Sequence, residues 1–176
     1  AAFRDLSVMQ RDMGPADLAA ELGRRSAVLS AFVHRTGGCV ASLDHGMLLA
    51  FWGAPLAQAD HHTRACETAL RMCAGSGLPL ALGMETGSVL AGCLGTGFRP
   101  DYGILGEAVH RARMASRYGS LMGSGITVTE ELRTRLGGRA ALRSLGRVHM
   151  GESTTPERLY EVLDQADAGG TVPGDA

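Results

Sequence analysis

Apolar residues recur along this chain with two different spacings, and the change from one to the other predicts its elements. Spacings of three and four residues predict helices over 17–36, 60–74, 106–118 and 130–136, with Asp60 and Thr129 as N-cap candidates. Short apolar runs between Gly, Pro and Asp predict strands, which fall at 3–9, 39–43, 47–52, 78–85, 88–94, 101–105, 126–128, 147–150 and 159–163. The second and third of these strands are expected to form a hairpin, and so are the fourth and fifth.

The order of the predicted elements indicates the fold class. Strand, helix, strand, strand, helix and strand follow one another, which is the split β-α-β order of ferredoxin-like folds. We therefore expect an α/β (α+β) fold: a ferredoxin-like βαββαβ core with extra C-terminal strands and a helix, and an antiparallel-rich sheet. One domain is expected over 1–163, and the Gly-, Ala- and Asp-rich residues 164–176 are expected to be a disordered tail.

The amino-acid composition argues against several classes of function. The formal net charge is −1, which gives no global field for nucleic acid, and all 17 basic residues are Arg, so chemistry that needs Lys is excluded. No apolar run is long enough to span a bilayer, and no membrane contact by this fragment is expected. The first residue is not Met, from which we expect a domain excised from a longer signalling protein.

The cysteines and their spacing also bear on chemistry. Cys39, Cys66, Cys73 and Cys93 form no CxxC pair, so a zinc site is not expected. Cys66 and Cys73 lie seven residues apart on one helix face, which fits two buried apolar residues. This usage is typical of a reducing, cytoplasmic compartment.

Five segments, in order and with matching spacing, carry a family resemblance. They are Leu-Ala-Phe-Trp-Gly-Ala-Pro at 49–55, Asp-His-His-Thr-Arg-Ala-Cys-Glu-Thr-Ala-Leu at 60–70, the segment 82–95, Arg-Pro-Asp-Tyr-Gly-Ile-Leu-Gly-Glu-Ala-Val at 99–109, and Pro-Glu-Arg-Leu-Tyr-Glu-Val at 156–162. Together they resemble the bacterial class III adenylate and guanylate cyclase catalytic domain over about 3–163.

The resemblance implies a reaction and a dimer. Members of that family close ATP or GTP into a cyclic monophosphate, with two carboxylates of one protomer holding two Mg²⁺ or Mn²⁺ ions. The partner protomer supplies purine-binding residues and an Asn and an Arg for the transition state. A homodimer, or a heterodimer with another cyclase domain, is therefore implied, with a nucleotide as a possible ligand.

The resemblance also assigns seven catalytic or binding roles to positions of this chain. Only one of these positions keeps a residue with the chemistry that its role needs. Asp5 matches the first metal aspartate, whereas Gly46 replaces the second, and its usual Gly neighbour falls on His45. The remaining roles fall on residues of other chemistry: the purine-binding Lys on Ser42, the second purine position on Gly103, the ribose Asn on His110, the transition-state Arg on Met114 and the late phosphate-binding Lys on Met150.

These replacements predict negligible turnover. Loss of a transition-state arginine alone costs about 10³–10⁵ in phosphoryl transfer. Two Mg²⁺ ions are also poorly held by a lone carboxylate. Because the losses affect both sides of the interface, rescue of a partner's active site is not expected either.

Some residues have alternative interpretations. Asp44 lies two residues from Gly46, and a slip of the hairpin would bring it to the metal, but we favour a turn aspartate in Asp-His-Gly. Asp5 is either a surviving ligand or a polar residue at a strand end. His110 could donate to a ribose or be an interface residue.

Three hypotheses follow. The first is a degenerate class III cyclase domain that acts in signal transduction as a dimerising, non-catalytic module binding a nucleotide or partner. The second is a weak or unusual adenylate or guanylate cyclase that uses Asp5, Asp44 and His110. The third is a plain protein-interaction module.

Overall fold

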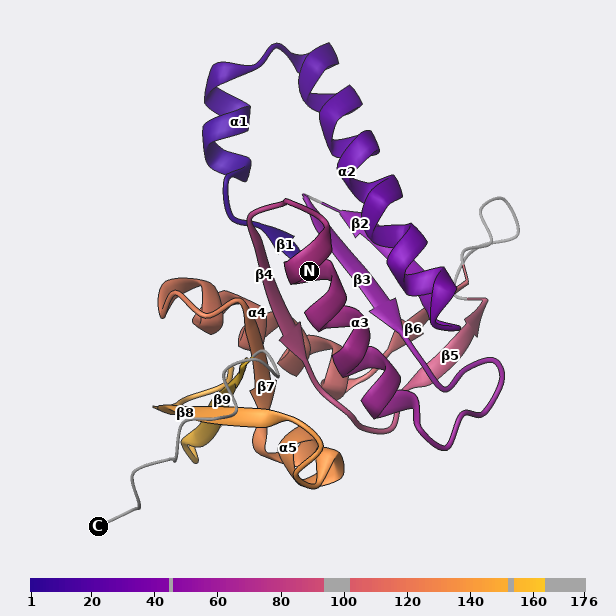
Figure 1. Cartoon of the computed structure of the whole chain (residues 1–176), viewed down its shortest axis with the longest axis vertical. Coiled ribbons are helices and arrows are strands. Elements are labelled where there is room, and N and C mark those ends of the chain that lie inside the picture. The colour runs from indigo at the N-terminus through magenta and orange to yellow at the C-terminus, as the bar shows by residue number, and fades with distance from the viewer. Residues whose placement is uncertain (45, 94–101, 152–153, 164–176) are drawn as a thin grey trace.

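The computed structural model of the chain has a core of ferredoxin-like order (Figure 1). It describes residues 1–44, 46–93, 102–151 and 154–163; His45, much of the loop expected between the fifth and sixth strands, and the predicted tail at 164–176 lie outside them. The core elements are β1 (Ala2–Phe3), α1 (Leu6–Asp12), α2 (Pro15–Arg35), β2 (Cys39–Asp44), β3 (Met47–Phe51), α3 (His61–Gly75) and β4 (Leu80–Met84). After them come β5 (Leu90–Cys93), β6 (Tyr102–Leu105), α4 (Glu107–Leu121), β7 (Ile126–Thr129), α5 (Glu130–Leu136), β8 (Ala141–Val148) and β9 (Glu157–Leu163).

The main sheet confirms the expected fold class. Its strand order is β2-β3-β1-β4-β7-β9-β8, and every neighbouring pair is antiparallel except β4 with β7. The first four strands of this order form the ferredoxin-like core. β7, β9 and β8 extend the sheet on the β4 side, which confirms the predicted C-terminal additions.

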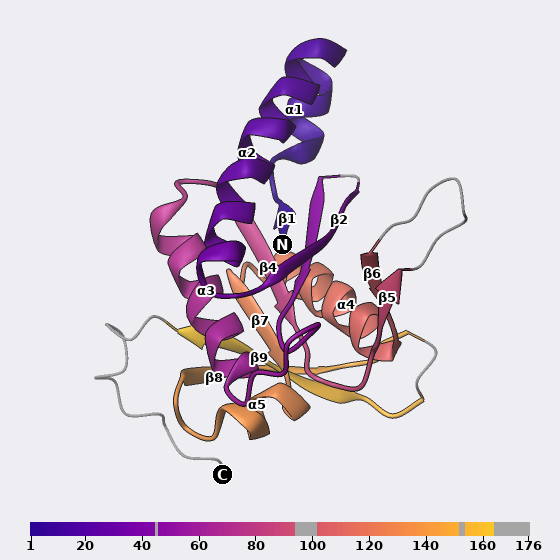
Figure 2. The ribbon, with the colours of Figure 1, turned by 90° about the vertical axis from the view of Figure 1, so that its right-hand side faces the viewer.

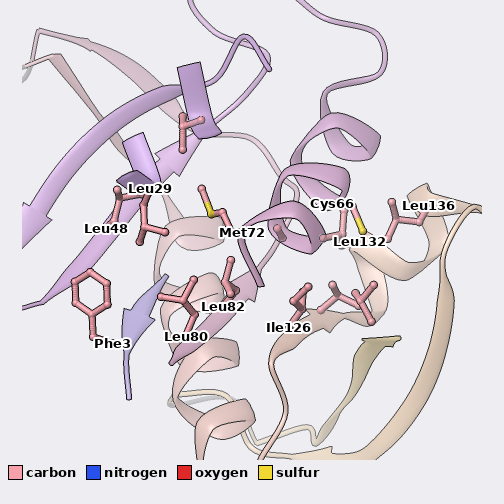
Figure 3. Close-up of a cluster of buried hydrophobic side chains, with 14 of the residues drawn as sticks. Phe3, Leu29, Leu48, Cys66, Met72, Leu80, Leu82, Ile126, Leu132 and Leu136 are labelled. Atoms are coloured by element: carbon pink, nitrogen blue, oxygen red, sulfur yellow. The ribbon is translucent and has the colours of Figure 1, made fainter. Parts of the chain in front are cut away.

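Helices cover both faces of this sheet (Figure 2). α2 and α3 pack on one face, where Leu29, Cys66, Met72 and Leu82 belong to one buried cluster (Figure 3). α4 packs on the other face, above Gly83, because neighbouring residues of a strand face opposite sides. The main core therefore lies between the sheet and α2, α3 and α5.

Two glycines let α4 approach the sheet closely. A Cβ on Gly83 of β4 would lie 2.1 Å from both Ala112 O and Ser116 N of α4. A Cβ on Gly119 of α4 would lie 1.9 Å from Thr127 Oγ1 of β7. The backbones of α4 and β4 are thus in direct contact, and Ser116 Oγ donates to Ala81 O at 3.0 Å.

The strand predicted at 3–9 is wrong beyond its first residue. β1 ends at Phe3, and the N–H groups of Val8 and Met9 both donate to Asp5 O at 3.0 Å, in the first turn of α1. Leu6, Met9 and Met13 all pack on the core cluster, and their spacing is helical. A run of seven residues that looks like a strand therefore folds as a strand end followed by a short helix.

The hairpin predicted between 78–85 and 88–94 is also wrong. β5 pairs with β6 in a separate two-stranded sheet, with Gly92 opposite Gly103. β4 already has β1 on one edge and β7 on the other, so no edge remains for β5. The predicted hairpin of β2 and β3, by contrast, is confirmed.

Three smaller predictions differ as well. β8 starts at Ala141 rather than 147, because a register shift between Ser144 and Gly146 breaks the alternation that reveals a strand. Asp60 occupies the N-cap of α3, but its carboxylate pairs with Arg64 instead of capping the helix. Cys73 is exposed, whereas Cys66 is buried as expected. The Thr129 cap of α5 is confirmed by its hydrogen bond from Leu132 N.

Candidate functional site

The two positions predicted as metal ligands lie at the same end of neighbouring strands. Asp5 follows β1 and occupies the N-cap position of α1. Gly46 immediately precedes β3, and its carbonyl oxygen accepts a hydrogen bond from Phe3 N at 3.3 Å. The fold therefore brings the two positions together.

The carboxylate of Asp5 is held by an arginine. Arg25 Nη1 of α2 lies 2.8 and 3.0 Å from the two carboxylate oxygens of Asp5. The Arg25 side chain is only 12% exposed, also bonds Glu21 at 2.6 Å, and lies over the ring of Phe3. The hydrogen bonds that Arg25 donates, the one to Asp5 foremost, raise the pKa of Arg25, and its positive charge is permanent.

The second metal position is filled by a neighbouring apolar side chain. Gly46 has φ +72°, a conformation that favours glycine, and a Cβ built on it would lie 2.6 Å from Leu6 Cδ2. An aspartate at this position would have to displace Leu6. In the described part of the chain no group of three or more His, Cys, Asp or Glu side chains could hold a metal ion. The residues present therefore do not fit a pair of Mg²⁺ or Mn²⁺ ions.

The other candidate residues of the β2–β3 hairpin lie on β2. Asp44 ends β2 opposite Met47 and is exposed. Ser42 is half-buried opposite Leu49, next to a register shift after Val40. A slip that brought Asp44 to the Gly46 position would break the observed pairing of this hairpin.

The positions predicted to act on a partner's nucleotide lie on β6 and α4. Gly103 is half-buried on β6, and His110 is exposed on α4. A Cβ on Gly151 would lie 3.1 Å from His110 Nε2, so the imidazole faces the segment that follows β8. Neither position keeps the residue type that the resemblance assigns to it.

The two positions predicted to neutralise phosphate have become part of a hydrophobic cluster. Met150 is 5% exposed and packs with Ala115 and Leu159, and Met114 packs against the same cluster. The predicted transition-state arginine and phosphate-binding lysine are thus replaced by two methionines that share one apolar environment. This environment penalises a buried charge.

An ion network near this cluster was not predicted. Glu85, whose side chain is 2% exposed, accepts from Arg111 Nε at 2.7 Å, Thr129 Oγ1 at 2.7 Å and Thr86 N at 2.8 Å. Arg111 also pairs with Glu157 of β9. The only sequence signal is that Glu85 is the first charged residue after the apolar run of β4, and its partners are distant in the chain.

The chain was compared with known proteins by sequence and by fold. No protein-family model matches the chain. Adenylate cyclase 1 of Rhizobium meliloti (strain 1021) is 24% identical over 172 residues, which cover 90% of this chain and 26% of that protein. The chain thus spans about a quarter of the length of this curated relative.

Solved structures show the same arrangement of elements. The adenylyl cyclase CyaB from P. aeruginosa has a TM-score of 0.81 at 20% identity, over 93% of this chain and 91% of that one. The dimeric guanylyl cyclase domain of the RhoGC fusion protein from Blastocladiella emersonii has a TM-score of 0.70 at 20% identity, over 92% of each chain. No helix in the described residues is long and apolar enough to cross a bilayer. The chain therefore has the fold of the class III adenylyl and guanylyl cyclase catalytic domains.

Proposed function

We propose that this chain is a degenerate class III cyclase domain, which acts in signal transduction as a dimerising module without catalytic turnover. The observation that carries the proposal is the closure of the metal site from both sides. Arg25 neutralises Asp5, and Leu6 fills the space beside Gly46. Two metal ions need carboxylate oxygens that this arrangement does not offer.

The phosphate-binding half of the site supports the same proposal. Met114 and Met150 share one hydrophobic cluster, and neither side chain carries charge. The chain has no Lys at all, so no lysine elsewhere substitutes for the lost ones. This chain therefore supplies neither half of a composite site with its full set of electrostatic groups, in a homodimer or in a heterodimer.

Dimerisation is supported by exposed apolar side chains on the small sheet. Leu90 and Leu105 face each other across β5 and β6 and are 64% and 58% exposed. Tyr102, on β6, stacks on Phe51 of β3 at 6.2 Å and is itself exposed. Exposed apolar side chains such as the Leu90–Leu105 pair are typical of a protein interface. We propose that a second cyclase domain, of this chain or another, covers it.

Turnover assays test the absence of catalysis. Cyclic nucleotide production from ATP and from GTP is measured with Mg²⁺ and with Mn²⁺, beside the Asp5→Asn variant. We expect no product above that variant. Product that depends on Asp5 would establish the weak cyclase that uses Asp5, Asp44 and His110, and would overturn the proposal.

Association and ligand binding are measured separately. Sedimentation equilibrium is expected to show a dimer for the unchanged chain and a monomer for Leu90→Glu/Leu105→Glu. Calorimetry with ATP and GTP then separates a nucleotide-binding module from a plain protein-interaction module. A chain that remains monomeric at every concentration and binds no nucleotide would leave only a heteromeric partner as the route to dimerisation.

A further inference from the structure

Two arginines lie directly opposite each other on β8 and β9, the strands beside α5 (Figure 1). They are Arg147 of β8, which is exposed, and Arg158 of β9, which is half-buried. Directly opposite residues of an antiparallel pair project to the same face, with Cβ atoms about 4.5–5.5 Å apart. Like charges in this arrangement destabilise a sheet. The pair therefore lowers stability unless a counter-charge is bound between its two side chains.

A shift in the register of β8 against β9 produces this pair. Up to Ser144, which lies opposite Tyr160, β8 follows one register, and from Gly146 onwards it is displaced by one residue. Had the first register continued, Arg147 would lie opposite Glu157. An attractive pair of opposite charges is thus exchanged for a repulsive one. Register shifts of this kind are frequent next to functional sites, where they change the direction of a side chain.

The arginine pair lies on the face of β8 and β9 that α5 covers. Leu159, between Arg158 and Tyr160, packs into the cluster on the α4 face, so its two neighbours point to the opposite face. There Tyr160 donates to Glu130 of α5, and the guanidinium of Arg133 lies over the Tyr160 ring at 5.2 Å. The pair is therefore separate from the two methionine positions, which belong to the α4 face.

The carboxylates around this face are already neutralised. Each of them has another arginine as its partner: Glu130 pairs with Arg133, Glu157 with Arg111 and Glu161 with Arg143. In the part of the chain that the structure describes, neither Arg147 nor Arg158 forms an ion pair with an acidic side chain. Among the described residues, two positive charges on this face therefore lack a counter-charge.

Tyr160 holds one of the two arginines in place. Burial and then the hydrogen bond to Glu130 raise the pKa of Tyr160, and a hydrogen bond from Arg158 acts in the opposite direction. A guanidinium group has five N–H donors, so this bond leaves donors of Arg158 for a ligand. Arg147, on the exposed side, has its whole guanidinium group available. The two side chains thus combine a positioned donor with an adaptable one.

We propose that Arg147 and Arg158 bind a phosphate dianion, either free or as the phosphate group of a small monoester. A phosphate monoester carries about −1.5 to −2 charges and three acceptor oxygens at pH 7, so one such group balances both arginines. A carboxylate carries a single charge and would leave one arginine unbalanced. Arginine also suits phosphate geometrically, because its planar group donates two parallel N–H bonds. The proposal depends neither on the absence of turnover nor on dimerisation.

Thermal unfolding in phosphate and in chloride buffer, at the same pH and ionic strength, tests the site. In chloride, Arg147→Gln relieves the repulsion and should raise the midpoint of unfolding by about 1–3 °C. In phosphate the order should reverse, because only the unchanged chain gains stability from the bound anion. Arg117→Gln is the matched control, since Arg117 is an exposed arginine of α4. It should respond to phosphate as the unchanged chain does.

A titration measures binding directly. Inorganic phosphate is added while the Nε–H signals of the arginine side chains are followed by NMR. The signals of Arg147 and Arg158 should shift and saturate, and Arg147→Gln and Arg158→Gln should each raise the dissociation constant about tenfold or more. The same titration with AMP separates the two sources. A monoester site binds AMP at least as tightly as inorganic phosphate, and a site for the free anion binds it more weakly.

Two results would overturn the proposal. One is a shift that does not saturate and that chloride reproduces, since the arginines would then only protect the edge of the sheet. The other is a phosphate affinity that neither substitution changes, with midpoints of unfolding that keep the same order in both buffers. None of these measurements uses turnover or association, so failure here is distinguishable from failure of the proposed function.

Discussion

Arg25 of α2 holds both carboxylate oxygens of Asp5, twenty residues earlier in the chain, at 2.8 and 3.0 Å. This ion pair connects α2 to the end of β1. Asp5 is also the only carboxylate that the family resemblance finds at a metal-binding position of this chain, and Arg25 binds it. We expect a carboxylate in this state to act as a structural group. Its removal should change stability rather than turnover.

A double-mutant cycle tests this role. Asp5→Asn and Arg25→Gln should each destabilise the fold, and together they should cost less than the sum, with a coupling energy of about 1–2 kcal/mol. Urea unfolding of the four proteins measures it. Arg24→Gln is the matched control, since Arg24 is 60% exposed and pairs with Glu21. If the losses in the free energy of unfolding add to within about 0.5 kcal/mol, the Asp5–Arg25 pair does not contribute to the stability of the fold.

The contact between Leu6 and Gly46 gives a second prediction. Gly46→Ala should destabilise more than Gly77→Ala, by about 1 kcal/mol or more, because both glycines have positive φ but only Gly46 has a neighbour. A Cβ on Gly77 meets nothing within 4 Å. Thermal unfolding of the two variants provides the comparison. Equal losses would mean that Leu6 moves aside freely, and the second metal position would then be open.

The Glu85 network gives a third prediction. Arg111→Met leaves the buried Glu85 carboxylate without its cation, and should cost about 3–5 kcal/mol. Arg143→Met removes a pair with Glu161 in which the arginine is 66% exposed, and should cost less than about 1 kcal/mol. Urea unfolding compares them. A similar small loss in both would show that Glu85 is hydrated.

Restoring a cation to the phosphate-binding positions should harm the fold. Met150→Lys introduces a charge at a 5% exposed position and should cost about 3 kcal/mol or more. Met122→Lys makes the same chemical change at a 43% exposed position and should stay within about 0.5 kcal/mol. Near-equal stability of the two variants would mean that the cluster around Met150 opens readily to water.

Local patterns predicted the elements whose partners are adjacent in the chain. The β2–β3 hairpin, α2 and the Thr129 cap of α5 follow from spacing and turn residues alone. The partner of β5 could not be predicted in this way, since both edges of β4 are taken by strands far away in sequence. α1 was hidden because seven residues are too few to separate helical from strand periodicity.

The sequence likewise predicted some features of the candidate site and not others. That the Asp5 and Gly46 positions are neighbours follows from the expected strand order. Their present contacts do not, because nothing in the spacing of α2 shows that Arg25 turns towards β1, or that Leu6 covers Gly46. Likewise, the replacement of two cations by methionines was evident from the sequence, but their shared cluster was not.

The absent side chains of Gly83 and Gly119 determine how this fold can move. Because backbone meets backbone there, α4 cannot slide or roll over β4 and β7 without opening close contacts at both ends. α4 and the middle of the sheet therefore behave as one rigid block, with α1 and α2 standing out at the β1 end (Figure 2). A force that displaces α4 would therefore displace β4 and β7 together with it.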